Sequence, residues 1–252
     1  SATLTVDAVA PTSFSDDGAV ATGAGETITI SGGSGLKRMA SGGDAAKVVG
    51  SSGTCSDSAA GGTAEVTDLG PDNTDGATSA QAAFTFTIAG DYKVCYKPAA
   101  GSYAQVGSAT LTVDAVAPTS FSDDGAVETG GVDQVTFTGG SGLKLGSGQD
   151  AAKVVGFSGT CLDAAAGGTT EVTNLAPDDS DAATQAKVDF MFTIAGDYKV
   201  CYKTCGDSYL RVGSGFVTAL AKGATNYNPS AVTAGSSHTV TFTGGSGFKL
   251  MP

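Results

Sequence analysis

The sequence has no Trp, a single His, and few aromatic or charged side chains, at 7% and 15% of 252 residues. It also lacks any apolar run near the roughly 20 residues that a membrane-spanning helix needs, and any useful stretch of helical periodicity. We therefore expect neither membrane insertion in this piece nor a helical fold. Apolar residues still make up 40% of the chain, which is enough to build packed cores and argues against wholesale disorder.

Basic residues are scarce as well. Lys and Arg number 13 against 25 Asp and Glu, so the net charge is −12 and the pI is near 4.2. A field of this sign repels polyphosphates and anionic membrane surfaces. The charge balance therefore argues against nucleic acid as a partner.

The side chains that enzymes use in sets are missing. His238 is the only His, so neither a His-based zinc site nor a Ser-His-Asp triad can be assembled. The segments GGSGLK at 32–37 and 139–144 and GGSGFK at 244–249 lack the spacing of a phosphate loop, and no helical pattern follows them. We interpret them as turns in which Gly takes positive φ. The sequence predicts a non-enzymatic protein without a cofactor.

Sites for N-linked glycans are also absent, because no Asn lies in an N-x-[ST] motif. Asn228, for example, is followed by Pro229. O-linked glycans on exposed Thr and Ser faces stay open, since composition alone does not test them.

Repetition is the strongest positive signal. Residues 1–20 recur without change at 108–127, and FTIAGDYKVCYK occurs at both 86–97 and 192–203. A third, more divergent copy begins around Ser214. A period near 107 residues is the size of a small domain and is too long for a solenoid unit. The chain is therefore predicted to be a tandem array of domains.

The repeat sets the expected domain boundaries. Residues 1–7 are the last strand of a preceding repeat or a donated strand, 8–114 are repeat 1, 115–220 are repeat 2, and 221–252 start an incomplete third repeat. The chain opens with SATLTVDA, without Met or a signal peptide. We interpret it either as a chain whose leader was removed or, preferably, as a piece of a longer parent.

Period-two alternation marks short strands throughout each repeat. In TITI, Ile28 and Ile30 share one face and Thr residues occupy the other. The same inward positions in the second and third copies hold Val135, Phe137, Val240 and Phe242. Clusters of Gly, Pro, Asp and Asn separate the strands. Several short strands in about 107 residues predict an all-β fold, with one β-sandwich per repeat.

The segment FTIAGDYKVCYK reads as a strand end, a tight corner and the next strand. It resembles the E–F corner of immunoglobulin-like domains, where a Tyr lies shortly before a Cys. Here the spacing is Tyr92-x-x-Cys95, not Tyr-x-Cys, and no Trp is available to pack against a central bridge. VTFTGGSGLK also resembles the start of IPT/TIG domains over about ten residues. These resemblances imply tandem immunoglobulin-like sandwiches and carry over no active residue.

Strand parity in YKVCYK places Tyr92, Val94 and Tyr96 toward the core and Cys95 on the outer face between two lysines. An inter-sheet core bridge is therefore not expected. A Cys on this face is instead expected to bind a loop that lies over the sheet.

Four of the five cysteines keep the same spacing in both copies. We infer the disulfides Cys55–Cys95 and Cys161–Cys201, since two unrelated free thiols per repeat would not explain the matched spacing. Disulfides imply an extracellular or cell-surface location. Cys205 is left over; it could form an intermolecular bond, pair with a Cys beyond Pro252, or remain free.

Acidic residues near the expected repeat junctions are the candidate metal ligands. They are Asp7, Asp16, Asp17, Asp114, Asp123 and Asp124. Converging carboxylates could bind Ca²⁺ and stiffen the array. No run matches a calcium-binding loop, however, and Asp-Gly is ordinary turn chemistry, so solvated turns are the default interpretation.

Near-unchanged duplication of a whole domain extends length without adding a site. The leading prediction is an extracellular structural repeat protein that associates with copies of itself end to end in a filament or stalk. Strand donation between subunits is one way to form the joint. The alternative is an adhesin or receptor ectodomain that binds a sugar or a protein, for which Tyr103 and Tyr209 are isolated candidates.

Overall fold

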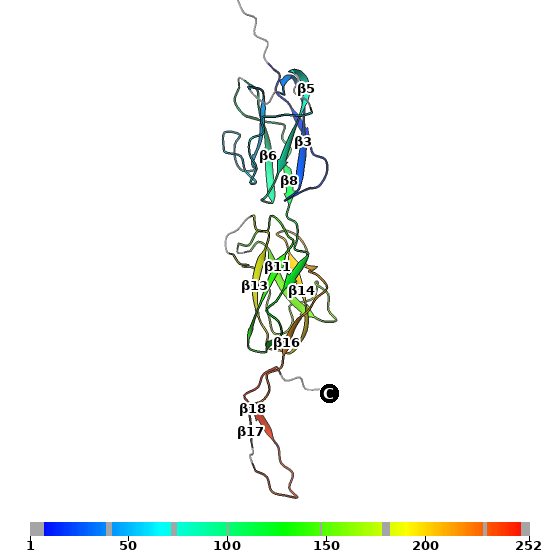
Figure 1. The fold of residues 1–252 in the computed structure, drawn as a ribbon, viewed down its shortest axis with the longest axis vertical. Helices are drawn as coiled ribbons and strands as arrows, with labels where there is room; N and C mark the ends of the chain where they lie inside the picture. The colour runs from blue at the N-terminus through cyan, green and yellow to red at the C-terminus, as the bar shows by residue number, and fades with distance from the viewer. Residues whose placement is uncertain are drawn as a thin grey trace, which may run out of the picture. The chain divides into compact units, whose positions relative to one another are not determined.

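The structure is a computed structural model that describes residues 8–38, 42–71, 75–99, 101–146, 148–177, 182–228 and 231–247. Every regular element in these ranges is a β-strand (Figure 1). The chain divides into two compact units, Ser1–Val116 with Ser141–Leu143, and Ala117–Gly140 with Lys144–Pro252. The predicted all-β sandwich class is confirmed. Within the described part of the chain, no helix has the length and apolar character needed to cross a membrane.

The first unit contains two facing sheets. One has the order β1-β3-β5, formed by Ser13–Ser15, Gly25–Lys37 and Asp75–Thr85. The other has the order β2-β8-β6-β4, with β7 also paired to β6; its strands are Val20–Ala21 (β2), Ala45–Gly50 (β4), Gly90–Lys97 (β6), Ala104–Gln105 (β7) and Leu111–Asp114 (β8). Neighbouring strands are antiparallel except β2 and β8, which are parallel.

The second unit repeats this order. The smaller sheet is β9-β11-β13, formed by Ser120–Ser122, Val132–Thr138 and Ala186–Met191. The larger is β10-β16-β14-β12 with β15 on β14; its strands are Val127–Glu128 (β10), Ala151–Gly156 (β12), Gly196–Lys203 (β14), Leu210–Arg211 (β15) and Val217–Leu220 (β16). A short hairpin follows, of β17 (Asn226–Asn228) and β18 (Thr241–Thr243).

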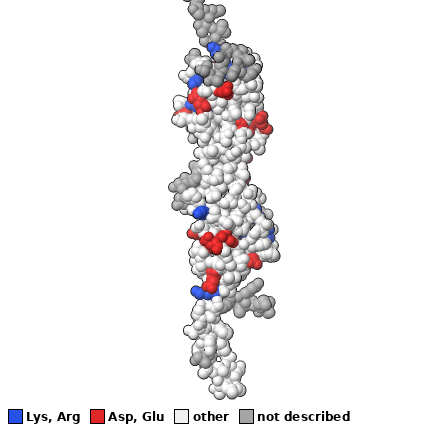
Figure 2. All heavy atoms as spheres, in the orientation of Figure 1, with Lys and Arg blue, Asp and Glu red and all other residues white. Residues whose placement is uncertain are grey.

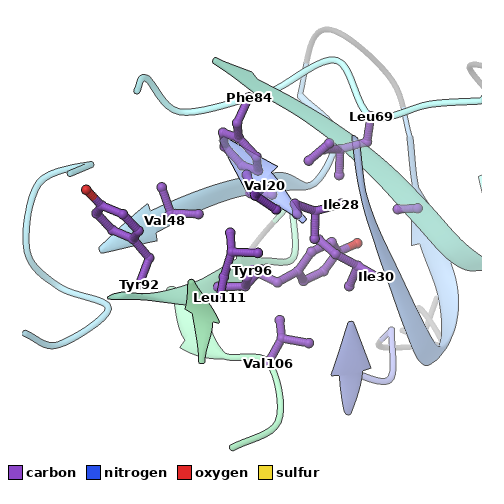
Figure 3. Close-up of a cluster of buried hydrophobic side chains, with 14 of the residues drawn as sticks. Val20, Ile28, Ile30, Val48, Leu69, Phe84, Tyr92, Tyr96, Val106 and Leu111 are labelled. Carbon is purple, nitrogen blue, oxygen red and sulfur yellow. The ribbon is translucent and has the colours of Figure 1, made fainter. Parts of the chain in front are cut away.

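Alternation in the sequence becomes alternation in burial. Along β13, buried and exposed residues strictly alternate, and β11 alternates buried with half-buried residues after its exposed first residue. In the first unit the inward side chains of both sheets meet in one apolar cluster, which includes Ile28, Ile30, Phe84 and Tyr96 (Figure 3). This cluster is the core that holds the two sheets together.

The strand of the repeated twelve-residue segment is central to the larger sheet. Tyr92, Val94 and Tyr96 of β6 belong to the apolar core, as strand parity predicts. The Tyr92 hydroxyl donates to the Ile88 carbonyl oxygen at 2.8 Å, and Tyr198 donates to Ile194 at the same distance. A Tyr that bonds back to the backbone just upstream is the tyrosine corner of immunoglobulin-like sandwiches.

The outer face of β6 is covered, not open. Cys95 is buried and is joined to Cys55 in a loop that follows β4. Two lysines bind the same loop from the sheet: Lys47 Nζ donates to the Asp57 carbonyl oxygen at 2.6 Å, and Lys93 Nζ donates to Gly53 at 2.8 Å. Burial on both faces explains why the β4 segment AAKVVG has no exposed residue.

The second unit repeats the clamp. Cys161 and Cys201 are joined across the same sequence separation of 40 residues. Lys153 and Lys199 donate to the carbonyl oxygens of Asp163 and Gly159, each at 2.7 Å.

The inward orientation expected for Val240 and Phe242 is wrong. Val240 is 45% exposed and Phe242 is 63% exposed. The reason is that β17 and β18 form a two-stranded sheet, and an apolar face is buried only when a second layer packs on it.

Replacement of both Cys161 and Cys201 by Ser is expected to lower the free energy of unfolding of the second unit by about 3–4 kcal/mol. The link closes about 40 residues, and its loss frees that much chain entropy in the unfolded state. Urea unfolding followed by Tyr fluorescence measures the change. Cys205→Ser, which removes an exposed thiol, is the control. Its free energy of unfolding should stay within about 0.5 kcal/mol of that of the unsubstituted protein. Equal midpoints for double variant and control would contradict the prediction.

Candidate functional site

A buried threonine at the end of the first unit receives the tip of a GGSG turn. Thr22 follows β2, is only 3% exposed, and its N–H donates to the Asp114 carbonyl oxygen at the end of β8. Ser141 Oγ donates to the Thr22 carbonyl oxygen at 2.9 Å, and the two hydroxyl oxygens lie 2.8 Å apart. Because the Ser141 proton is used on the carbonyl, Thr22 donates to Ser141 Oγ. We call the threonine the seat and this reciprocal contact the turn–seat contact.

The second unit contains the same contact. Thr129 is 2% exposed, and Ser246 Oγ donates to its carbonyl oxygen at 2.9 Å. The hydroxyl oxygens of Thr129 and Ser246 are 2.7 Å apart. The Lys222 N–H adds a longer hydrogen bond to Thr129 Oγ1 at 3.4 Å. The same arrangement occurs in both units, each time on a buried threonine hydroxyl. This recurrence indicates a specific contact.

Glycine makes the turn–seat contact sterically possible. A Cβ added to Gly142 would lie 2.5 Å from Thr22 Cγ2, and one added to Gly247 would lie 2.5 Å from Thr129 Cγ2. Both glycines also have positive φ, at 63° and 70°. A side chain in the left-handed region that also clashes with the seat is doubly unfavourable.

The first GGSG turn has the same backbone and no seat. Ser34 exchanges two backbone hydrogen bonds with Val9, at 2.9 and 3.1 Å. Its side chain is exposed, and in the described part of the chain no threonine stands against it as Thr22 stands against Ser141. Within the described residues, the turn at Ser34 therefore lacks the turn–seat contact that the turns at Ser141 and Ser246 make.

The acidic residues proposed as metal ligands are spread out. Asp7 lies outside the described residues, while Asp16, Asp17 and Asp114 are exposed. Among the described residues, no group of three or more His, Cys, Asp or Glu side chains could hold a metal ion. The calcium hypothesis therefore gains no ligand set from the structure.

Asp133 is an acidic residue that the sequence analysis did not single out. It lies on β11, is fully buried, accepts a hydrogen bond from the Asp124 N–H at 3.3 Å on Oδ1, and has no partner for Oδ2. Burial raises the pKa of the Asp133 carboxyl; the Asp124 N–H lowers it, and the charges of Asp123 and Asp124 raise it further. Alternation within a strand that reads VDQVTFT predicts the inward position, but only the structure shows that the Asp133 side chain is fully buried.

Tyr103 and Tyr209 are the aromatic candidates for binding. In the structure, each ring packs against two lysine side chains of its own unit. The ammonium groups of Lys47 and Lys97 lie 4.1 and 5.1 Å from the Tyr103 ring centroid. Interaction with the Tyr103 hydroxyl lowers the pKa of the Glu65 carboxyl, and Lys97 lowers it further. Tyr209 is surrounded in the same way by Lys153 and Lys203. Cation–π contacts of this kind anchor the rings on the sheet.

A second buried acidic site also escaped the sequence analysis. Asp150 is fully buried and accepts hydrogen bonds from the Tyr202 hydroxyl at 2.7 Å and from the N–H groups of Lys144 and Cys205 at 3.0 and 2.8 Å. Asp44 has the equivalent partners in the first unit. The Cys205 backbone is thus tied to the core, while its thiol is free and exposed.

Comparison with known proteins leaves the family open. No protein-family model matches the chain, and no curated protein matches it. One similar solved structure is SGBP-B of the Bacteroides ovatus mixed-linkage glucan utilization locus, in complex with a mixed-linkage heptasaccharide, at 14% identity and a TM-score of 0.25 over 81% of this chain and 44% of that one. The chain thus spans less than half of that protein. Another is the full ectodomain (Ig1–Ig3) of mouse nectin-like molecule 4, at 9% identity and a TM-score of 0.31 over 90% and 67%. Likeness at this level assigns neither function nor ligand.

Gly142→Ala is expected to destabilise the first unit more than Gly35→Ala. Both glycines have positive φ, at 63° and 69°, so both substitutions cost about 1 kcal/mol of backbone strain. Only Gly142 meets the seat, because the nearest atom to a Cβ on Gly35 is Ala8 Cα at 3.6 Å. The clash should add about 1–3 kcal/mol, measured by urea unfolding. Equal losses in the two variants would show that the turn–seat contact contributes no stability.

Asp133 makes the stability of the second unit depend on pH. Its pKa is raised from 3.8 in the folded state, so the folded state holds the proton more tightly than the unfolded chain does. The linked stability is fully present below pH 3.8 and is lost as pH rises through the folded-state pKa. The unfolding free energy of the unsubstituted protein minus that of Asp133→Asn should therefore decrease as the pH rises from 3 to 7. Glu128→Gln, at an exposed position and not among the groups that shift the Asp133 pKa, is the control; a difference that is flat with pH would refute the assignment.

Proposed function

We propose that the protein is a non-catalytic, extracellular structural repeat protein whose immunoglobulin-like sandwiches follow one another in a stalk or filament. The turn–seat contact is the observation that supports this most directly. Each of the two described seats is filled by the GGSG turn of the following sequence repeat, and the turn at Ser34 has no seat among the residues that the structure describes. A seat of the same kind, from a further repeat or from another copy, would complete the contact at Ser34.

The internal construction of each unit suits exposure outside the cell. Each unit has one disulfide that binds a loop to the sheet, and disulfides persist in oxidising compartments. Figure 2 shows acidic side chains in several clusters, separated by wide surface that carries no charge. A net charge of −12 keeps such repeats soluble and limits unspecific association.

Strand donation is one route to end-to-end joining. The sheets β1-β3-β5 and β9-β11-β13 have three strands, whereas β17-β18 has two. The face of this hairpin exposes Tyr227 and Phe242, which are cross-strand partners. A strand equivalent to β13, from the same polypeptide or from a second copy, would extend this sheet and cover its apolar side chains.

Electron microscopy of the native material, with sedimentation velocity of the 252-residue chain at increasing concentration, tests the proposal. Fibres or rods with an axial repeat of one or two domains are expected, together with concentration-dependent association of the chain if copies join. Monodisperse monomers at all concentrations would refute association between copies. Native material without elongated particles would refute the structural role itself.

A further inference from the structure

The second repeat carries larger or charged side chains at several surface positions where the first does not. Alignment of the cysteines pairs each of these positions with one 106 residues earlier, where the first repeat carries a smaller or uncharged residue. The pairs are Ser51 with Phe157, Ser56 with Leu162, Gln105 with Arg211, and Thr110 with Phe216. Other exposed positions differ as well, including Ala104 with Leu210 and Thr85 with Met191.

Three of the new side chains lie together. The rings of Phe157 and Phe216 have centroids 5.0 Å apart and planes inclined by 32°. The Arg211 guanidinium lies 5.1 Å from the Phe216 centroid and donates through Nη2 to the carbonyl oxygens of Ser214 and Gly215, at 2.7 and 3.3 Å. Phe157 is nevertheless 61% exposed and Phe216 is 37% exposed. The group is ordered by its own contacts and open to solvent.

Phe216 also lines a shallow cleft of about 440 Å³ within the second unit. The other side chains of this cleft are Phe121, the hydroxyls of Ser120, Ser122 and Ser214, and the carboxylate of Asp123. At the corresponding positions the first repeat has Ser13, Phe14, Ser15, Asp16 and Ser108, but Ala109 and Thr110 stand where the second has Gly215 and Phe216. Phe216 in place of Thr110 is therefore the step that adds an exposed aromatic wall to a polar cleft.

We propose that this cleft binds a neutral saccharide unit, with Phe216 as its aromatic wall and Asp123 and the three serines as hydrogen-bond partners. A sugar ring presents an apolar C–H face and a rim of hydroxyls, which matches one aromatic wall beside several polar groups. The size of the cleft suits one or two sugar rings. The acidic chain and the Asp123 carboxylate disfavour an anionic ligand. This site goes beyond the structural role and does not depend on how the repeats assemble.

Phe216→Thr is the central test, because the first unit forms the same fold with Thr110 at this position. The intact 252-residue chain and its variants are applied to an array of neutral gluco-, galacto- and manno-oligosaccharides, and affinities for the strongest of them are measured by calorimetry. Phe216→Thr and Asp123→Asn should each weaken binding about tenfold or more. Circular dichroism and urea unfolding show whether each variant is folded.

Leu162→Ser is the matched control. Leu162 is 83% exposed and is not among the residues that line the cleft, so its loss should leave saccharide binding within about twofold. As a converse test, the first repeat receives the corresponding side chains of the second. The substitutions are Ser51→Phe, Gln105→Arg, Ala109→Gly and Thr110→Phe. This should raise the stoichiometry toward two sugars per chain.

Three results would overturn the proposal. The first is that the unsubstituted 252-residue chain binds no neutral saccharide on the array. The second is binding that survives Phe216→Thr in a folded variant. The third is equal loss in Leu162→Ser and Phe216→Thr, which would instead assign the exposed apolar side chains to a protein partner.

Discussion

Burial of one strand on both faces is the constraint on which each sandwich depends. The strand GDYKVCYK turns two tyrosines and a valine into the core on one side. On the other side it holds a loop through a disulfide and a lysine. A substitution at almost any of its positions would leave a cavity, a broken covalent link or an unpaired polar group. This explains why the segment occurs twice without change while the surrounding loops diverge.

The same constraint determines where charge can be buried. Asp44 and Asp150 each meet a tyrosine of this strand and two backbone N–H groups, so the buried carboxylates have hydrogen-bond partners. Asp133 lacks a partner on one oxygen. Burial raises the pKa of both the Asp133 and the Asp150 carboxyl, and the hydrogen bonds of Asp150 oppose that rise. Two carboxylates in the same domain thus differ in how fully their hydrogen bonds are satisfied.

The fold could be predicted from local patterns, because strand parity and turn residues act over a few neighbouring residues. Ile28 and Ile30 and the tyrosine positions followed from alternation alone. Burial of Val240 and Phe242 could not be judged in this way, since it depends on whether a second sheet is present. The seat at Thr22 and the cleft at Phe216 join residues far apart in sequence. Only a position-by-position comparison of the two repeats marks Phe216, and nothing local marks Thr22.

The disulfides also set how far a repeat can lengthen under mechanical load. When an unfolding repeat is pulled from its ends, the segment between Cys55 and Cys95, which are 40 positions apart, stays looped out of the path of the force. At about 3.4 Å per extended residue, that withholds about 140 Å from the maximum extension of each repeat. Reduction of the bond would release this length. An array of such domains would therefore be a tether whose reach depends on the redox state of its surroundings.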